Sequence, residues 1–410
     1  MKHLVIGAQD GTGALLPAGR KQIGANFSLW LDFMRWFAAW AVLVAHIGDN
    51  QLAYVSGIPA PERSPLHYVF AFFAGFGHPA VMAFFVISGF LVGGGYWRSW
   101  AEQRTEPYRF YMAKRILRLD LVLVPACLLT LVLDMAGKGL LGGAAAGIYL
   151  PPQANSDGLP ALACNLAFLQ TAVCHEFGTD GALWSLFNEF WYYVLWPPLM
   201  AALFFPIGAV FRLGLLLGVG AVAGVLTQFQ FTGAPLGPYM LIWLLGVVAE
   251  ARDKPVFNCP RWLAVLLFLV ALVGVRIVFR RGDVEGYGIF AFLRDFGLGV
   301  LFCNMLIALK NDPRLKAPFG GGLHARLAGF SYSLYCTHTP VLMVYAAVTI
   351  ACLGTGWRMV PAGVLPWLIV LGAFAISLMV GYLFSRGTEA HTDRVRRALF
   401  RLLHWRVGGA

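Results

Sequence analysis

The 410-residue chain has little charge. Asp, Glu, Lys and Arg together make up 12% of it, whereas a soluble globular protein has about 25%. Hydrophobic residues make up 59% and gather in long runs. Long uncharged runs of this kind exclude an ordinary soluble enzyme and predict an integral membrane protein.

Other signals are also missing. Residues 1–26 lack the charged start, apolar core and small-residue cleavage site of a signal peptide, so we expect the first span to be retained. The seven cysteines have no metal-ligand spacing, and we expect no metal. Cys164 and Cys174 share one loop; they could form a disulfide in an oxidising compartment, and two free thiols are equally compatible with the sequence.

The apolar runs predict an all-α fold, a polytopic integral membrane bundle of about ten transmembrane helices. The predicted spans are 28–48, 67–96, 115–136, 182–205, 211–230, 236–250, 262–279, 288–309, 325–352 and 362–385. The run 67–96 is long enough to tilt, or to break at Gly75–Gly77 or Pro79.

Lys and Arg lie mostly on one side of these spans. With the N-terminus inside, cytoplasmic segments hold 23 of the 31 Lys and Arg residues, and this bias predicts that both termini are cytoplasmic. It also accounts for the net charge of +11 without nucleic acid as a partner. The chain then divides into a cytoplasmic segment (1–26), a transmembrane domain (27–386) with a long external loop (137–181), and a basic cytoplasmic tail (387–410) suited to the surface of an anionic bilayer.

Arg35 and His46 lie within the first span, eleven residues apart. A helix places them roughly 16 Å apart and on nearly the same face. An ionisable side chain in a membrane span is costly and usually marks a functional site. The alternative is an Arg that reaches the interface and a His that only packs.

Arg115 and Arg118 are i,i+3 neighbours where the third span enters the membrane from the cytoplasmic side. Guanidinium groups in pairs suit phosphate binding, and Arg35 lies near the same leaflet. The three arginines predict an anion site, although ordinary anchoring at the cytoplasmic interface remains an alternative for the pair.

Glu189 lies inside the fourth span and shares a helix face with Ser185. A buried carboxylate needs a partner, and His46, in the middle or outer half of the first span, is the obvious candidate. A structural, hydrogen-bonded Glu is the alternative. The ninth span contains an unusually polar stretch from Ser331 to His338, in which His338 is either a supporting group at the site or a packing residue.

These segments together resemble the membrane-bound acyltransferase 3 family, over roughly residues 27–385. The matching positions are Asp32, Arg35 and His46; the run Phe84–Phe90 with Ser88; Arg115 and Arg118; Trp184, Ser185, Leu186 and Glu189; and Ser331–His338 with Tyr335. Trp36 stands where the family usually has Gly after the first Arg, which could reshape the cytoplasmic mouth.

The resemblance implies an O-acyltransferase of the bacterial cytoplasmic (inner) membrane. Its donor would be cytoplasmic acetyl-CoA or another acyl-CoA, and its acceptor a hydroxyl of an extracytoplasmic carbohydrate or lipid-linked glycan. Arg35, Arg115 and Arg118 would hold the CoA phosphates, while His46 and Glu189 would be catalytic. Asp32, Ser88, Trp184, Ser185, Tyr335 and His338 would support them.

The residues leave two roles open for His46: general base on the acceptor hydroxyl, or covalent carrier of the acyl group. A second class of protein also fits buried His, Glu and Arg residues, namely a proton-coupled transporter of a small polar or sugar-like substrate. Transporters often show internal repeats, and the sequence shows none. The acyl chain, the acceptor and the oligomeric state are not specified by the sequence.

Overall fold

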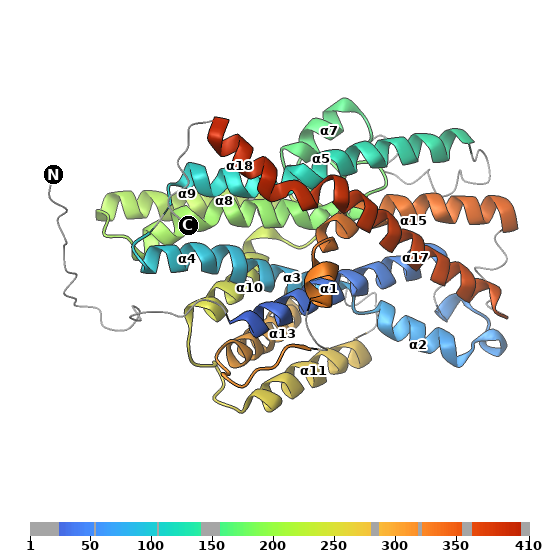
Figure 1. Cartoon of the computed structure of the whole chain (residues 1–410), viewed down its shortest axis with the longest axis horizontal. Helices are drawn as coiled ribbons and strands as arrows, with labels where there is room; N and C mark the ends of the chain where they lie inside the picture. Colours follow the sequence, from blue (N-terminus) through green and yellow to red (C-terminus); the bar gives the residue numbers. More distant parts are fainter. Residues whose placement is uncertain are drawn as a thin grey trace.

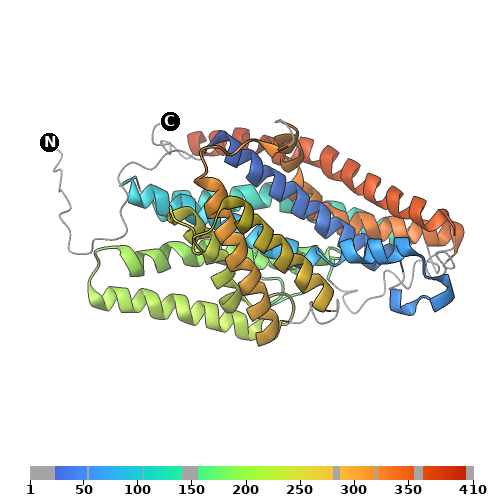
Figure 2. The ribbon, with the colours of Figure 1, turned by 90° about the horizontal axis from the view of Figure 1, so that it is seen from below.

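The computed structural model describes residues 24–52, 55–104, 106–140, 156–279, 287–318, 322–354 and 363–402. The expected N-terminal segment up to residue 23, residues 141–155 of the long loop, and the tail beyond residue 402 lie outside these ranges. The described part is a helical bundle in which α5 and α8 run along the long axis, while α11 and α13 cross it obliquely (Figures 1 and 2). No strand occurs in the described ranges, which agrees with the predicted all-α class.

All ten predicted spans are helical, although the second comprises several helical segments and the ninth includes the end of a short helix that precedes Ser331. Their bounds are α1 (Ala25–Gln51), α2 (Pro65–Ala74) followed by α3 (Gly77–Ser88), a π-helix (Gly89–Gly93) and α4 (Gly94–Ala101), α5 (Tyr108–Leu140), α8 (Trp184–Phe204), α9 (Ala209–Phe229), α10 (Leu236–Ala251), α11 (Arg261–Val278), α13 (Ile289–Lys310), α15 (Ser331–Leu353) and α17 (Leu365–Gly387). In the described ranges, eight helical segments are long and apolar enough to cross a membrane; α10 is shorter and α8 is not among the eight.

Shorter helices complete the bundle: α7 (Leu159–Leu166), the 3-10 turn η4 (Gly181–Leu183), α14 (Leu323–Ala328), the turn η6 (Glu389–His391) and α18 (Thr392–Leu402). The polar stretch 108–114 belongs to α5, which therefore begins seven residues before the predicted span. Hydropathy marks the part of a helix that lies in lipid, and the helix itself can continue beyond it.

The outer helices expose apolar side chains. Helix α9 has no buried residue, and Ala264 is the buried residue of α11. Val210 and Ile277 are among their large hydrophobic residues, with 88% and 71% of their surface exposed. Such faces are stable in hydrocarbon and not in water, so they are the lipid-facing surface of a multi-pass membrane protein.

The second span breaks at Gly75 and Phe76, between α2 and α3, which is one of the alternatives that the sequence leaves open. The break leaves carbonyl groups at the end of α2, and Arg276 of α11 donates hydrogen bonds to two of them, at Ala71 (2.7 Å) and Phe72 (3.0 Å). A Cβ atom at position 75 would lie 1.9 Å from Nε of Arg276, so glycine is needed for this close approach.

The core positions the site. Helices α1, α3, α5, α8 and α15 pack side by side, with α1 in contact with α3 and α15, and α5 in contact with α8 and α15. Helix α10 packs against α3 and the π-helix.

Candidate active site

A cavity of about 100 Å³ lies among α1, α3, α5, α8 and α15. Six of the residues that the sequence singles out line it, although they come from five separate helices: Arg35, Ser88, Arg118, Ser185, Glu189 and Tyr335. Tyr193, Ser331 and Tyr332 add further polar groups to the wall. The lining therefore combines cations, a carboxylate and hydroxyl groups in the middle of an apolar bundle.

Glu189 is held by hydroxyl groups. Ser88 Oγ donates to Glu189 Oε1 at 3.0 Å, and Tyr193, one turn further along α8, donates to the same oxygen. Trp243 Nε1 in turn donates to Ser88 Oγ at 3.2 Å. This chain of donors fixes the carboxylate at the cavity wall. The expected pairing of Glu189 with His46 is absent from the described hydrogen bonds, which go to Ser88 and Tyr193 instead.

Two glycines bring Trp243 next to Ser88. A Cβ atom on Gly89 would lie 1.9 Å from the carbonyl oxygen of Trp243, and one on Gly246 would lie 1.9 Å from the carbonyl oxygen of Val86. Helices α3 and α10 thus meet backbone to backbone at the level of the cavity. Gly89 and Gly246, which have no Cβ atom, are what permits this contact.

Ser185 and Tyr335 form the second hydroxyl pair of the lining. Their oxygens are 2.6 Å apart, and Tyr335 donates to the carbonyl of Ala182 at 2.8 Å. A tyrosine hydroxyl has one hydrogen, so with that hydrogen on Ala182 the Ser185 hydroxyl must be the donor to Tyr335. The start of α8 is tied to α15 through this pair.

His338 lies beside Tyr335, and His46 packs against His338; neither histidine is among the lining residues. Their ring centroids are 4.9 Å apart with the planes at 79°, and the rings of Tyr335 and His338 are 5.9 Å apart. His338 is buried, while His46 is half-buried. The structure thus brings together the two histidines that the sequence treats separately.

The arginines divide between two environments. Arg35 donates to Asp32 (3.2 Å) and to the carbonyl of Ala328 (3.4 Å), and both Arg35 and Arg118 line the cavity. Arg115 instead places its guanidinium over the Tyr111 ring, 5.3 Å from the centroid. Residues three apart point in directions that differ by about 60° on a helix, enough to separate two long side chains.

Glu389 is a residue that the sequence analysis did not single out. It lies in η6, accepts hydrogen bonds from the backbone N–H (3.0 Å) and hydroxyl (2.9 Å) of Ser333, and interacts electrostatically with Arg118 and Arg35. In the sequence, Glu389 stands out only as a carboxylate just after the last apolar run. Tyr193 was also missed, although its i,i+4 spacing from Glu189 indicates a shared face.

Trp184 lies at the start of α8, outside the cavity lining. Its ring contacts those of Phe85 and Tyr287, with centroids 6.2 and 6.0 Å away.

Among the described residues, no group of three or more His, Cys, Asp and Glu side chains is placed to hold a metal ion.

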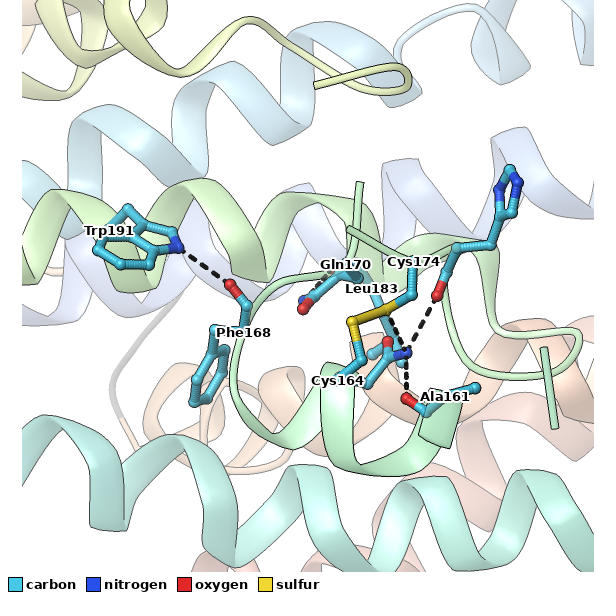
Figure 3. The surroundings of a disulfide bond; sticks show 9 residues. Ala161, Cys164, Phe168, Gln170, Cys174, Leu183 and Trp191 are labelled. Carbon is cyan, nitrogen blue, oxygen red and sulfur yellow. Dashed lines mark hydrogen bonds between the residues drawn. A yellow bond between two sulfur atoms is a disulfide. The ribbon is translucent and has the colours of Figure 1, made fainter. Parts of the chain in front are cut away.

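The structure joins Cys164 and Cys174 by a disulfide, the first of the two states that the sequence leaves open (Figure 3). The closed loop is fastened to α8 and to the preceding turn η4: Trp191 of α8 donates to the carbonyl of Phe168 at 3.0 Å, and Gln170 donates to that of Leu183 in η4 at 3.1 Å. The loop therefore supports the first turn of α8, where Ser185 begins the site.

Asp180 lies between this loop and η4 and is fully buried. Burial, with Asp134 nearby as a second cause, raises the pKa of the Asp180 carboxyl well above its ordinary value.

Comparison with known proteins gives one match. The family model described as an acyltransferase domain, that of the acyltransferase 3 family, matches residues 28–386. No curated protein and no solved structure matches the chain.

Proposed function

The chain belongs to the acyltransferase 3 family and is a multi-pass membrane acyltransferase, and from this premise we propose its substrates and its site. The donor is acyl-CoA, with acetyl the simplest acyl group, and it enters from the cytoplasm. The acceptor is a hydroxyl of an extracytoplasmic or lipid-linked glycan. The membrane is the bacterial inner membrane, with both termini in the cytoplasm, as the distribution of Lys and Arg indicates.

The cavity lining is the observation that supports this proposal most. Arg35 and Arg118 line a cavity whose wall also contains hydroxyl groups, among them that of Tyr335. The ring of Tyr335 lies beside His338, and His338 packs against His46. Two guanidinium groups in an apolar bundle suit the phosphates of CoA. Arg115, placed over Tyr111, adds positive charge without lining the cavity. The thioester end of the donor would then extend toward the histidines.

His46 carries the reaction in either of two ways. As a general base it takes the proton of the acceptor hydroxyl while the hydroxyl oxygen attacks the thioester carbonyl. The C–S bond then breaks, and the imidazolium returns the proton to the CoA thiolate. As a covalent carrier, His46 attacks the thioester first and releases CoA, and the acceptor hydroxyl then attacks the acyl-imidazole. Both routes need an unprotonated ring nitrogen on His46.

Glu189 has a different role from the one that a triad would give it. Its hydrogen bonds to Ser88 and Tyr193 hold its carboxyl group in the cavity wall. Electrostatic attraction between this carboxylate and the cavity arginines would keep the guanidinium groups turned inward before CoA binds. Asp32 and Glu389 would attract the guanidinium of Arg35 and restrict its orientation in the same way.

The test uses purified protein in lipid nanodiscs, radiolabelled acetyl-CoA, and the lipid-linked glycan fraction of the source membranes as acceptor. We expect wild-type protein to label the glycan and His46→Ala to be inactive while CoA still raises its unfolding temperature. His391→Ala, a histidine of η6 outside the cavity lining, is the matched control and should remain active. Wild-type protein that neither binds CoA nor labels glycan would overturn the proposal, and so would full activity in His46→Ala.

A further inference from the structure

A second group of ionisable side chains lies in the bundle outside the cavity lining. The carboxylate of Asp295 on α13 accepts hydrogen bonds from Nε of Arg294 and from the hydroxyl of Tyr239 on α10, both at 2.9 Å. Nε2 of His78 on α3 lies 2.7 Å from the same carboxylate. The side chains of Asp295 and Arg294 are only 1% and 5% exposed. Ionisable groups buried in membrane helices are costly and usually mark a functional site.

The carboxylate determines which nitrogen of His78 carries the ring hydrogen. Asp295 is paired with Arg294, and an ionised carboxylate only accepts hydrogen bonds, so Nε2 of His78 must be the donor. In the neutral ring, Nδ1 then has a lone pair and can only accept. No hydrogen bond to this Nδ1 occurs among the described residues. His78 therefore offers an oriented acceptor that the described part of the fold leaves open.

Aromatic rings connect His78 to the cavity. The ring of Tyr287 lies 5.7 Å from that of His78 and 6.0 Å from that of Trp184. Trp184 in turn contacts Phe85, which lines the cavity. Each of His78, Trp184 and Tyr287 is partly exposed, whereas Asp295 is buried. We call these four residues the His78 cluster: His78, Trp184, Tyr287 and Asp295.

The His78 cluster lies at the depth of His46. A Cβ atom on Gly77 would lie 2.5 Å from the Cβ atom of Ala45, so α1 and α3 cross at these two residues. His46 and His78 are the next residues along the two helices, and one residue advances a helix by about 1.5 Å. A ligand at His78 would therefore lie at the level of the proposed acyl transfer.

We propose that the His78 cluster binds the sugar of the acceptor: Nδ1 of His78 accepts a hydrogen bond from a sugar hydroxyl, and the rings of Trp184 and Tyr287 pack against the C–H groups of the sugar. The inference rests on the proposed function, in which the acceptor is a glycan. Aromatic walls with a few fixed polar groups are typical of sites for small polar ligands. Helix α13 exposes Phe290 (82%) in its first turn, so a lipid-linked sugar can reach the cluster from the bilayer.

Two substitutions separate sugar binding from a role in holding α3 against α13. His78→Gln can keep an amide donor near the position of Nε2 for Asp295 but has no acceptor at the position of Nδ1. Tyr287→Leu removes a ring and keeps an apolar side chain. The matched controls are His391→Gln in η6 and Tyr382→Leu on α17, both outside the cluster.

In nanodiscs with acetyl-CoA and the lipid-linked glycan fraction, we expect His78→Gln and Tyr287→Leu each to raise the KM for glycan about tenfold, ~1.4 kcal/mol. The KM for acetyl-CoA should not change, because other residues line the cavity, and both controls should match wild type. A wild-type KM for glycan in both variants would overturn the proposal. A loss confined to kcat would also overturn it and assign the cluster to the reaction itself. Equal rises in both KM values would reduce the cluster to a structural tie between helices.

A second measurement detects the sugar at His78 without turnover. In protein labelled with ¹⁵N-histidine, the His78→Gln spectrum identifies the His78 signals in solid-state NMR. Adding the glycan fraction without acetyl-CoA should shift the Nδ1 signal of His78, and Tyr287→Leu should weaken that shift. An unchanged Nδ1 signal at saturating glycan would overturn the proposal. If the signal shifts but no acyl group is transferred from acetyl-CoA, the proposed function fails and the sugar site stands; if transfer occurs with an unchanged Nδ1 signal, the sugar site fails and the function stands.

Discussion

Removing the disulfide by Cys164→Ser with Cys174→Ser should lower thermal stability by a calculable amount. The two cysteines are ten residues apart in the sequence. The chain-entropy relation gives about 2.7 kcal/mol for a loop of this length. At ~2.1 cal/mol/K of unfolding entropy per residue, a 410-residue chain would lose about 3 °C in unfolding temperature.

The loss should also appear locally, at the start of α8. Gln170 and Trp191 fasten the disulfide loop to η4 and to this helix, so a freed loop should loosen Ser185 and its bond to Tyr335. Hydrogen exchange measured by mass spectrometry should therefore rise over 159–190 in the double variant and stay unchanged in α11. The comparison with α11 separates local loosening from general destabilisation.

The assay is thermal unfolding in detergent with and without a thiol reductant, joined to mass tagging of thiols. Wild-type protein should lose about 3 °C on reduction, and the double variant should not respond to reductant. In spheroplasts, a membrane-impermeant thiol reagent should label Cys174 only after reduction, which would place the loop outside. Labelling of both cysteines without reduction, or no response to reductant in wild type, would refute the reasoning.

Three further outcomes follow from the site. Arg118→Ala should weaken CoA binding measured by calorimetry at least tenfold, about 1.4 kcal/mol, and adding Arg115→Ala should lower the affinity by a smaller factor, because of the two only Arg118 lines the cavity. Equal losses of affinity from the two substitutions would mean that both arginines bind phosphate. Glu189→Gln and Ser88→Ala should be non-additive in kcat, because they share one hydrogen bond; strict additivity would separate their roles. Asp180→Asn should flatten the pH dependence of the unfolding temperature. Burial raises the pKa of Asp180, so the protonated carboxyl stabilises the fold at about pH 4, and this contribution is lost as the pH rises through the raised pKa. An unchanged slope in the Asp180→Asn melts would exclude Asp180 as the source.

The helices could be predicted from the sequence because a membrane span must be apolar over about 20 residues, whatever the neighbouring helices are. It predicted the depth of Glu189 and His46 in the membrane, and that was enough to suggest a pair. It could not predict their direction around the helix axis, which depends on how α8 packs against α3 and α15. Ser88 and Tyr193 therefore replaced His46 as the partners of Glu189.

The arginines and histidines illustrate the same limit. Spacing placed Arg115 and Arg118 at one interface, but Arg118 lines the cavity, whereas the guanidinium of Arg115 lies over the ring of Tyr111 on the same helix. The contact of His46 with His338 joins residues 292 positions apart, which local patterns do not encode. The π-helix at Gly89–Gly93 was likewise not predicted, because the run of small and apolar residues there is equally compatible with an α-helix.

The contact between Gly75 and Arg276 constrains the order in which the two positions can change over generations. Replacing Gly75 first would force a methyl group into the guanidinium. Replacing Arg276 first would take away the guanidinium donor of the Ala71 and Phe72 carbonyls, of which Phe72 still accepts a hydrogen bond from the N–H of Gly75. Each single step is costly, although the double change could restore packing. Among descendants of this sequence, a side chain larger than hydrogen at position 75 should therefore occur only in lineages that carry a shorter residue at position 276.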